Sequence, residues 1–224
     1  MREKIIIFLK GSAALLIANL CTKAINFFLL PLYTKYLSPE QLGVSDSITT
    51  MTSLFFPILV LGLDSAYSAF YFDEKTDTYK NKVFSTTSFT LILTSVVPCI
   101  GIFFSKQIAS ILFGTEEYGW IVIIALLGMV CNLWYLPFSL YLRVENKMTA
   151  FAVISVVSSL VMIVSNIITV TVIHLGAAAL IVSTLVTNII MLILYAGCSK
   201  KLPSPNAVDL ALNKRMLKYS IPLV

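Results

Sequence analysis

The sequence predicts an all-α integral membrane protein with six transmembrane helices. Of its 224 residues, 58% are hydrophobic and only 12% are charged, and the mean hydropathy is +0.91. Soluble domains carry about 25% charged residues, so this chain has too few charges to cover a surface exposed to water. The apolar content excludes a disordered chain, and the length accommodates about six spans of about 20 residues with their loops.

Six long apolar segments stand out, near residues 11–36, 42–70, 83–104, 120–142, 151–173 and 176–198. Each is long enough to cross a hydrocarbon core of about 30 Å at about 1.5 Å per residue. They do not alternate in polarity as the strands of a β-barrel do, and inside lipid the backbone must satisfy its own hydrogen bonds. The segments are therefore predicted to be helices. Residues 1–199 make up this six-helix unit, and residues 200–224 are predicted to be a cytoplasmic linker and the start of a truncated seventh span.

The connections between the segments carry turn and capping residues. Ser38 or Glu40 is predicted to cap the second helix. In the longer loop before the fourth segment, residues 108–112 are predicted to lie flat on the membrane surface and to end at Gly114. Residues 174–176 form a very tight turn between the last two segments.

The distribution of lysine and arginine predicts the orientation of the chain. On one side of the membrane lie thirteen of the 16 basic residues: Arg2, Lys4, Lys10, Lys75, Lys80, Lys82, Arg143, Lys147, Lys200, Lys201, Lys214, Arg215 and Lys218. The other side has Lys35 and Lys106, and Lys23 falls inside a span. Because cytoplasmic loops carry the excess of positive charge, both termini are predicted to lie in the cytoplasm.

Lys23 is the only basic residue deep in a predicted span. A charge at the bilayer centre costs at least about 2.5 kcal/mol on insertion scales, so it is expected to face water or a partner. Asn19, Lys23 and Asn26 share one helix face. One interpretation is a cavity wall whose Lys23 contacts an anion such as a phosphate group. The other is a structural lysine paired with a carboxylate or carbonyls of a neighbouring helix.

The second segment carries a polar stripe, which consists of Asp46, Thr49, Thr50, Ser53, Pro57 and Asp64. In one continuous helix the two aspartates would be five turns, or about 27 Å, apart. They would then lie near opposite membrane surfaces and could not form a catalytic pair. The stripe predicts a hydrophilic path with Thr49, Thr50 and Ser53 in a substrate cavity. The alternative is interfacial carboxylates with ordinary hydrogen bonds between helices.

The sequence offers little support for an enzyme. It contains no Gly-rich phosphate loop, no metal-ligand cluster and no nucleophile triad, so no catalytic residue, cofactor or metal is predicted. The basic residues lie between apolar segments rather than on a polar domain, which excludes a nucleic-acid partner. The four cysteines are expected to be reduced and buried, since no Cys-x-x-Cys pair occurs.

Short motifs follow one another in a fixed order relative to the predicted spans. They are Leu37-Ser38-Pro39-Glu40-Gln41-Leu42-Gly43, Gly62-Leu63-Asp64-Ser65-Ala66, Phe70-Tyr71-Phe72, Leu112-Phe113-Gly114, Leu142-Arg143-Val144-Glu145-Asn146-Lys147 and Leu217-Lys218-Tyr219-Ser220-Ile221-Pro222-Leu223. In this order the chain resembles the multidrug/oligosaccharidyl-lipid/polysaccharide (MOP) exporter superfamily, and within it the Wzx-like polysaccharide flippases. The resemblance covers the whole chain but only about the first half of a family member.

The resemblance implies one lobe of a two-lobed transporter in the bacterial cytoplasmic membrane, with both termini in the cytoplasm. Such transporters move undecaprenyl-diphosphate-linked oligosaccharides from the inner to the outer leaflet by alternating access. Lys23 matches the cationic residues that meet the lipid pyrophosphate in this family. Asp64 and Arg143, in motifs at span ends, are candidates for gating at the cytoplasmic side. The expected partners are the lipid-linked oligosaccharide, the lipid bilayer, and a missing C-terminal lobe or a second copy.

Two alternative functions stay open at this point. A cation-coupled drug or metabolite exporter of the same superfamily needs an intramembrane carboxylate, but Asp46 and Asp64 are placed too near the membrane faces for this role. The early end of the seventh span raises the other alternative, an inert truncated membrane fragment.

Overall fold

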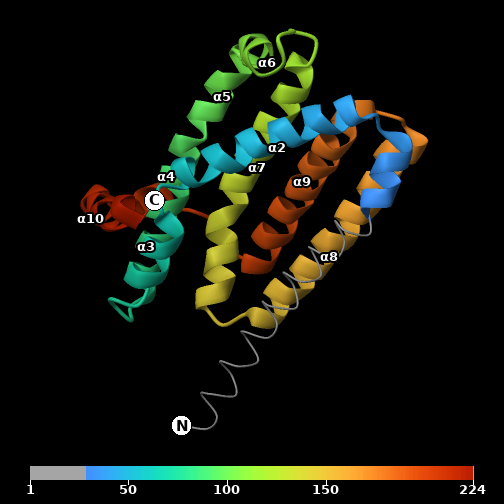
Figure 1. Ribbon diagram of the computed structural model, residues 1–224. Helices are drawn as coiled ribbons and strands as arrows, with labels where there is room; N and C mark the ends of the chain where they lie inside the picture. Colours follow the sequence, from blue (N-terminus) through green and yellow to red (C-terminus); the bar gives the residue numbers. More distant parts are fainter. Residues whose placement is uncertain (1–28, 224) are drawn as a thin grey trace.

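The structure is a computed structural model that describes residues 29–223, and every regular element in that range is a helix (Figure 1). Five helical stretches are long and apolar enough to cross a membrane: Pro39–Phe70, Asp77–Phe103, Gly119–Val144, Met148–Val172 and Gly176–Ser199. They overlap five of the six predicted segments. The segment near 11–36 falls mostly outside the described residues, and its described end, residues 29–36, is helical. The chain is therefore an all-helical, multi-pass membrane protein.

Helix α2 (Pro39–Val60) begins with a capping box, in which two backbone N–H groups of the helix end each donate to the side chain of the other residue. The Ser38 hydroxyl accepts from the Gln41 backbone N–H at 3.2 Å, and the Gln41 side chain accepts from the Ser38 N–H at 3.0 Å. The predicted cap at Ser38 is confirmed. The helix ends at Leu61 and Gly62, which both have left-handed backbones with φ of 54° and 64°.

The break at Leu61 and Gly62 corrects one prediction from the sequence. The polar stripe was expected to run along one continuous helix from Asp46 to Asp64. Instead α3 (Leu63–Phe70) is a separate helix with Asp64 in its first turn, so the stripe ends with α2. The physical reason is the left-handed backbone conformation of Leu61 and Gly62, which ends α2 and changes the direction of the chain.

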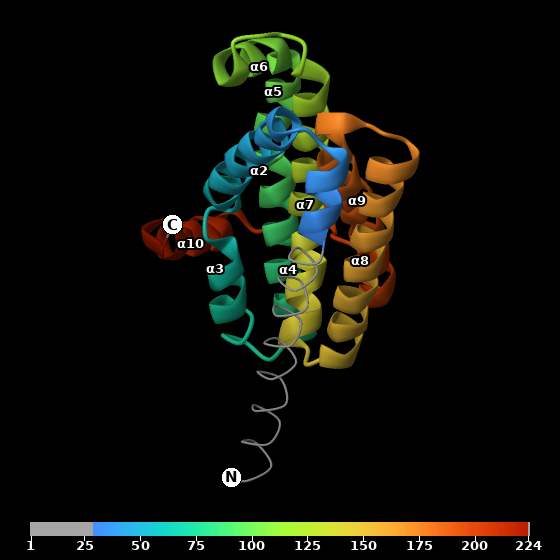
Figure 2. The ribbon, with the colours of Figure 1, turned by 45° about the vertical axis from the view of Figure 1, so that its right-hand side comes forward.

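Helices α4 (Asp77–Thr94) and α5 (Val96–Phe103) form the next span and are separated at Ser95. The Ser95 hydroxyl accepts a hydrogen bond from the Trp134 indole at 3.1 Å, which ties the break to α7. Helix α6 (Ser105–Phe113) lies at one end of the bundle (Figures 1 and 2). It ends at Gly114, whose φ is 70°, as the sequence predicted.

Helix α7 (Gly119–Val144) occupies the centre and packs most closely on α9 (Ala179–Ser199). Helix α8 (Met148–Ile167) continues as a π-helical turn over Ile168–Val172. The following tight turn leads into a 3-10 turn over Gly176–Ala178. On α8 a stripe of apolar side chains is more than half exposed, which fits a face in contact with lipid: Val153, Val156, Leu160 and Val164.

The residues after α9 fold back onto the bundle. They form a 3-10 turn (Pro205–Ala207), helix α10 (Leu210–Ser220) and a further 3-10 turn (Ile221–Leu223). Buried hydroxyls of α4 hold this segment in place: the backbone N–H groups of Ser204 and Asp209 donate to Ser85 and Thr86, both at 3.0 Å. Helix α10 then lies across α3 and α4 (Figure 2). The predicted start of a seventh span, from Met216 on, is described as far as Leu223, where it forms the end of α10 and the last 3-10 turn. The span itself stays a prediction.

The buried core gathers mainly around the part of α7 that leads to the α7–α8 loop. Its largest fully buried side chains come from five helices or their ends: Tyr67, Tyr71, Phe84, Leu91, Leu133, Leu142, Tyr195 and Met216. A second cluster joins the start of α2 to α6, α7 and the turn before α9. Between the two clusters, α2 crosses α7 and α9 (Figure 1). This crossing positions the candidate site.

Candidate substrate cavity

A cavity of about 280 Å³ lies between α2, α7 and α9. It is lined by Thr49, Thr52, Ser53, Phe56, Ile124, Ala125, Gly128, Met129, Asn132, Ile181, Thr184, Leu185 and Asn188. The α2 residues recur at the spacing of one helix face, and the crossing of α2 over α7 and α9 turns this face toward the cavity. Two of the predicted site residues, Thr49 and Ser53, are thus brought together in one wall.

The polar groups of the cavity wall are neutral. The hydroxyls of Thr49, Thr52 and Ser53 each donate to a backbone carbonyl of α2, at 2.8, 2.9 and 2.9 Å. A hydroxyl has one proton to donate and two lone pairs, so these oxygens can still accept hydrogen bonds from a ligand. No Asp, Glu, Lys or Arg is present among the described residues of the wall. The wall therefore suits a ligand rich in hydroxyl donors.

Two asparagines of the cavity were missed by the sequence reasoning. The Asn188 side-chain amide donates to the Gly128 carbonyl at 3.0 Å, which joins α9 to α7. Asn132 follows Gly128 by four residues and faces the same cavity. An amide inside a predicted span is a signal that could have found both residues, since polar groups in spans usually face a partner or a cavity.

The remaining predicted site residues have different positions. Thr50 is exposed outside the cavity lining, and its carbonyl accepts from Ser53. Asp64 and Arg143 are both exposed, and within residues 29–223 they form no ion pair with each other. The guanidinium of Arg143 lies 5.8 Å from the centre of the Phe151 ring.

The predicted polar face of the first span consists of Asn19, Lys23 and Asn26. All three lie outside the described residues, so their proposed contact with an anion stays a prediction. Within residues 29–223 no group of three or more His, Cys, Asp or Glu side chains could hold a metal ion.

A smaller, apolar groove lies on the other side of α2, with a volume of about 140 Å³. It is lined by Met51, Phe55, Leu59, Val97, Pro98, Gly101, Ile108, Leu126 and Met129. Met129 borders both this groove and the polar cavity. Helix α2 therefore separates a polar site from an apolar one within the same part of the bundle.

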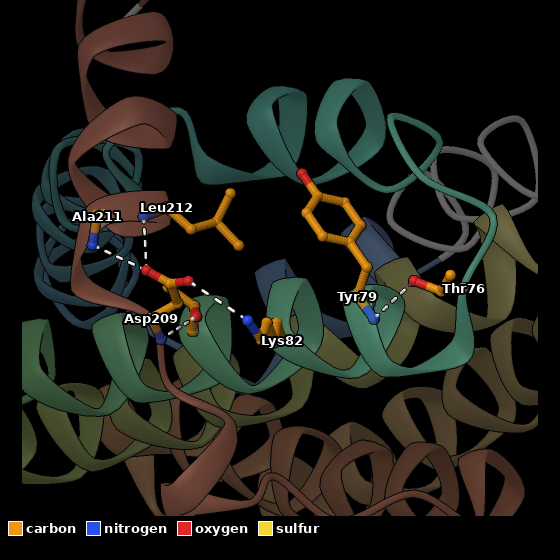
Figure 3. Close-up of polar contacts among 7 residues, drawn as sticks. Thr76, Tyr79, Lys82, Asp209, Ala211 and Leu212 are labelled. Atoms are coloured by element: carbon orange, nitrogen blue, oxygen red, sulfur yellow. Dashed lines mark hydrogen bonds and ion pairs between the residues drawn. The ribbon is translucent and has the colours of Figure 1, made fainter.

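A third hollow of about 300 Å³ lies where α10 meets α4 and the loop before it (Figure 3). Asp209 caps α10 by accepting from the backbone N–H groups of Ala211 and Leu212, both at 3.0 Å. Its other oxygen lies 3.7 Å from the Lys82 ammonium. The hydrogen bonds from Leu212 and Ala211, together with the nearby Lys82, lower the pKa of Asp209. These groups satisfy one another, so they hold α10 in place.

These features define a multi-pass helical membrane protein with a cavity between its spans whose described wall is polar and uncharged. The family described as "Polysaccharide biosynthesis protein" matches residues 32–224. Because this match covers most of the chain, the protein belongs to that family, which confirms the resemblance drawn from the motifs. Neither the curated proteins nor the solved structures gave a match. Family and fold together assign the chain a role in polysaccharide synthesis or export, of a transporter type.

Proposed function

We propose that this chain is the N-terminal lobe of a flippase for undecaprenyl-diphosphate-linked oligosaccharides. The lobe lies in the bacterial cytoplasmic membrane with both termini in the cytoplasm, and the substrate moves from the inner to the outer leaflet. The observation that carries the proposal is the cavity between α2, α7 and α9, whose wall presents hydroxyls and amides but no charge among its described residues. Sugars are hydroxyl-rich and neutral, so this chemistry matches an oligosaccharide.

The size of the cavity bears on how the substrate is held. At about 280 Å³ it lies at the lower limit of the roughly 300–1,000 Å³ typical of sites for drug-sized ligands. It can therefore hold only part of an oligosaccharide. A C-terminal lobe or a second copy of the chain completes the site in this proposal.

The apolar groove beside α2 fits the other end of the substrate. Its lining is apolar side chains and a glycine, which suits the isoprenoid chain of a carrier lipid. Because the two sites share Met129, one amphiphilic molecule could contact both. Lys23 stays the proposed contact for the diphosphate between them.

Alternating access requires helices that can bend. Breaks at Gly62 and Ser95 divide two spans, and Pro57 and Pro137 lie inside α2 and α7. Helices kink at prolines and at such breaks. We therefore propose that the lobe bends at these positions when the cavity changes its access from one side of the membrane to the other. Asp64, next to the first break, keeps its proposed role in gating with Arg143.

A cation-coupled exporter is less well supported. Ion coupling needs a carboxylate inside the membrane, and no carboxylate is present in the described cavity wall. Asp46 is exposed on the first half of α2, and Asp64 belongs to α3. Uptake that depends on an ion gradient, and that is abolished when either aspartate is neutralised, would favour this alternative.

Transfer of a labelled substrate tests the proposal. The chain is reconstituted in vesicles, alone and together with a separately supplied C-terminal lobe, with a fluorescent polyprenyl-diphosphate sugar. Quenching from outside then measures the rate of transfer between leaflets. We expect Asn132→Ala to slow transfer about tenfold, as expected for a hydrogen bond to the substrate lost from the cavity wall. Asn206→Ala, in the linker before α10, is the matched control and should leave the rate unchanged.

The outcomes separate the possibilities clearly. Absence of transfer with and without the second lobe would contradict the proposed function. A monomer that neither transfers the substrate nor is stabilised by it would instead favour an inert fragment. Equal rates for the Asn132 and Asn206 variants would show that the sugar does not use this cavity.

A further inference from the structure

Two lysines lie close to the ring of Tyr141 near the end of α7. The Lys201 ammonium lies 4.8 Å from the ring centre and that of Lys147 lies 5.1 Å from it. Lys201 also lies 5.9 Å from the centre of the Phe84 ring on α4. The aromatic faces attract the ammonium groups but accept no hydrogen bond in the ordinary sense, so the N–H donors stay available for an anion.

The nearby carboxylate of Glu145 is already engaged by other groups. It accepts from the Tyr71 hydroxyl at 2.7 Å and from the Lys80 ammonium at 2.9 Å. The two ion pairs within residues 29–223 join Lys80 to Glu145 and Lys82 to Asp209, and neither includes Lys147 or Lys201. Asp77, in the first turn of α4, is exposed to solvent and makes no ion pair in the same range.

Lys201 is held in this position by the end of α9. Lys200 has a left-handed backbone with φ of 51°, and the Lys201 N–H donates to the Ser199 hydroxyl at 3.3 Å. Burial lowers the pKa of Lys201, because a partly desolvated ammonium is less stable in its charged form. A bound anion would offset this desolvation. Among the described residues Lys201 is a partly buried lysine without an ion-pair partner, so it can accept an anionic ligand.

We propose that Lys147 and Lys201 bind a phosphate group of an anionic lipid headgroup beside Tyr141. Basic sites between membrane-spanning helices at their ends bind the phosphates of lipid headgroups. The phosphate can come from a membrane phospholipid or from the diphosphate of a carrier lipid, and both offer oxygens to the free N–H donors. The site is separate from the cavity between α2, α7 and α9. Binding of a membrane phospholipid there does not depend on the proposed transport function, whereas binding of a carrier-lipid diphosphate rests on it.

Equilibrium binding to the purified 224-residue chain in a neutral detergent tests this site. The probes are short-chain phosphatidylglycerol, short-chain phosphatidylcholine, farnesyl diphosphate and inorganic pyrophosphate. We expect phosphatidylglycerol or farnesyl diphosphate to bind more tightly than phosphatidylcholine. Lys201→Gln and Lys147→Gln should each weaken binding about tenfold, as for the loss of one charge-assisted hydrogen bond.

The matched control is Lys200→Gln. It removes the same charge from an exposed side chain at the residue before Lys201, and should change the affinity less than about twofold. Lys201→Arg keeps the charge and should retain most of the affinity. Helix content and melting of each variant are measured by circular dichroism. Because Lys147 is exposed, its variant tests the site even if the Lys201→Gln chain does not fold.

The probes distinguish the sources of the phosphate. Preference for phosphatidylglycerol supports a membrane phospholipid, and preference for farnesyl diphosphate supports a carrier lipid. Pyrophosphate binding as tightly as either lipid would overturn the assignment to a lipid headgroup. Equal lipid affinity of the unchanged chain and of Lys147→Gln/Lys201→Gln would overturn the site itself.

Discussion

The Tyr71 hydroxyl donates a hydrogen bond of 2.7 Å to the carboxylate of Glu145, which joins the end of α3 to the α7–α8 loop. Tyr71 is fully buried, and the Lys80 ammonium contacts the same carboxylate oxygen at 2.9 Å. The end of α3 and the start of α4 therefore meet the distant α7–α8 loop at one carboxylate. The first two predictions concern this junction.

Replacing Tyr71 with Phe should lower the stability of the protein by about 1–2 kcal/mol. A hydrogen bond to a charged group contributes about 1.5–3 kcal/mol, and the partial exposure of Glu145 reduces this value. The measurement is denaturant or thermal unfolding in detergent. Tyr219→Phe removes a hydroxyl from a half-exposed ring and serves as the control. Equal stability of the two variants would show that the Tyr71 hydrogen bond contributes nothing.

Stability should fall in acid through Glu145. Hydrogen bonds from Lys80 and Tyr71 lower the pKa of Glu145 below its ordinary value of 4.5. A carboxylate with a lowered folded-state pKa stabilises the fold fully above its unfolded pKa, and this contribution is lost as the pH falls through the lowered value. Unfolding measured between pH 7 and pH 3 should show a smaller acid loss for Glu145→Gln than for the unchanged chain. Glu117→Gln, in an exposed loop, should keep the full acid loss.

A matched pair of glycines tests the break between α2 and α3. A Cβ added at Gly62 would lie 2.7 Å from the Ser220 carbonyl oxygen of α10, and its φ of 64° disfavours any side chain. We expect Gly62→Ala to destabilise the protein by about 1–3 kcal/mol. Gly43 lies inside α2 with open space around it, so Gly43→Ala should stabilise the helix by about 0.5–1 kcal/mol. Thermal unfolding of the two variants should therefore shift in opposite directions.

The sequence predicts the spans well because hydropathy is local. The capping residue Ser38 and the helix end at Gly114 were also predicted correctly, since each depends on neighbours within a few residues. The break at Leu61 and Gly62 was not predicted. It lies within the apolar run Leu59-Val60-Leu61-Gly62-Leu63, where a leucine with a left-handed backbone gives no signal in composition.

The missed parts of the site depend on distant contacts. Asn188 donates to the carbonyl of Gly128, which lies 60 residues away in the sequence. Thr49 and Ser53 were predicted because their spacing places them on one face of one helix. The asparagines of α7 and α9 lie in the same cavity wall as these residues because α2 crosses both helices. Local sequence patterns do not predict how helices cross.

The last prediction compares two adjacent threonines of α4, both fully buried. The Thr86 hydroxyl accepts from the Asp209 N–H at 3.0 Å, whereas the Thr87 hydroxyl has no hydrogen-bond partner among the described residues. Thr86→Val leaves a backbone N–H unpaired, which costs about 1–3 kcal/mol, and should speed hydrogen exchange in the segment from Pro205 to α10. Thr87→Val has nearly the same shape and removes an unsatisfied hydroxyl, so it should leave the stability unchanged or raise it. If both variants unfold and exchange alike, the hydroxyls of α4 do not hold the segment after α9 against the bundle.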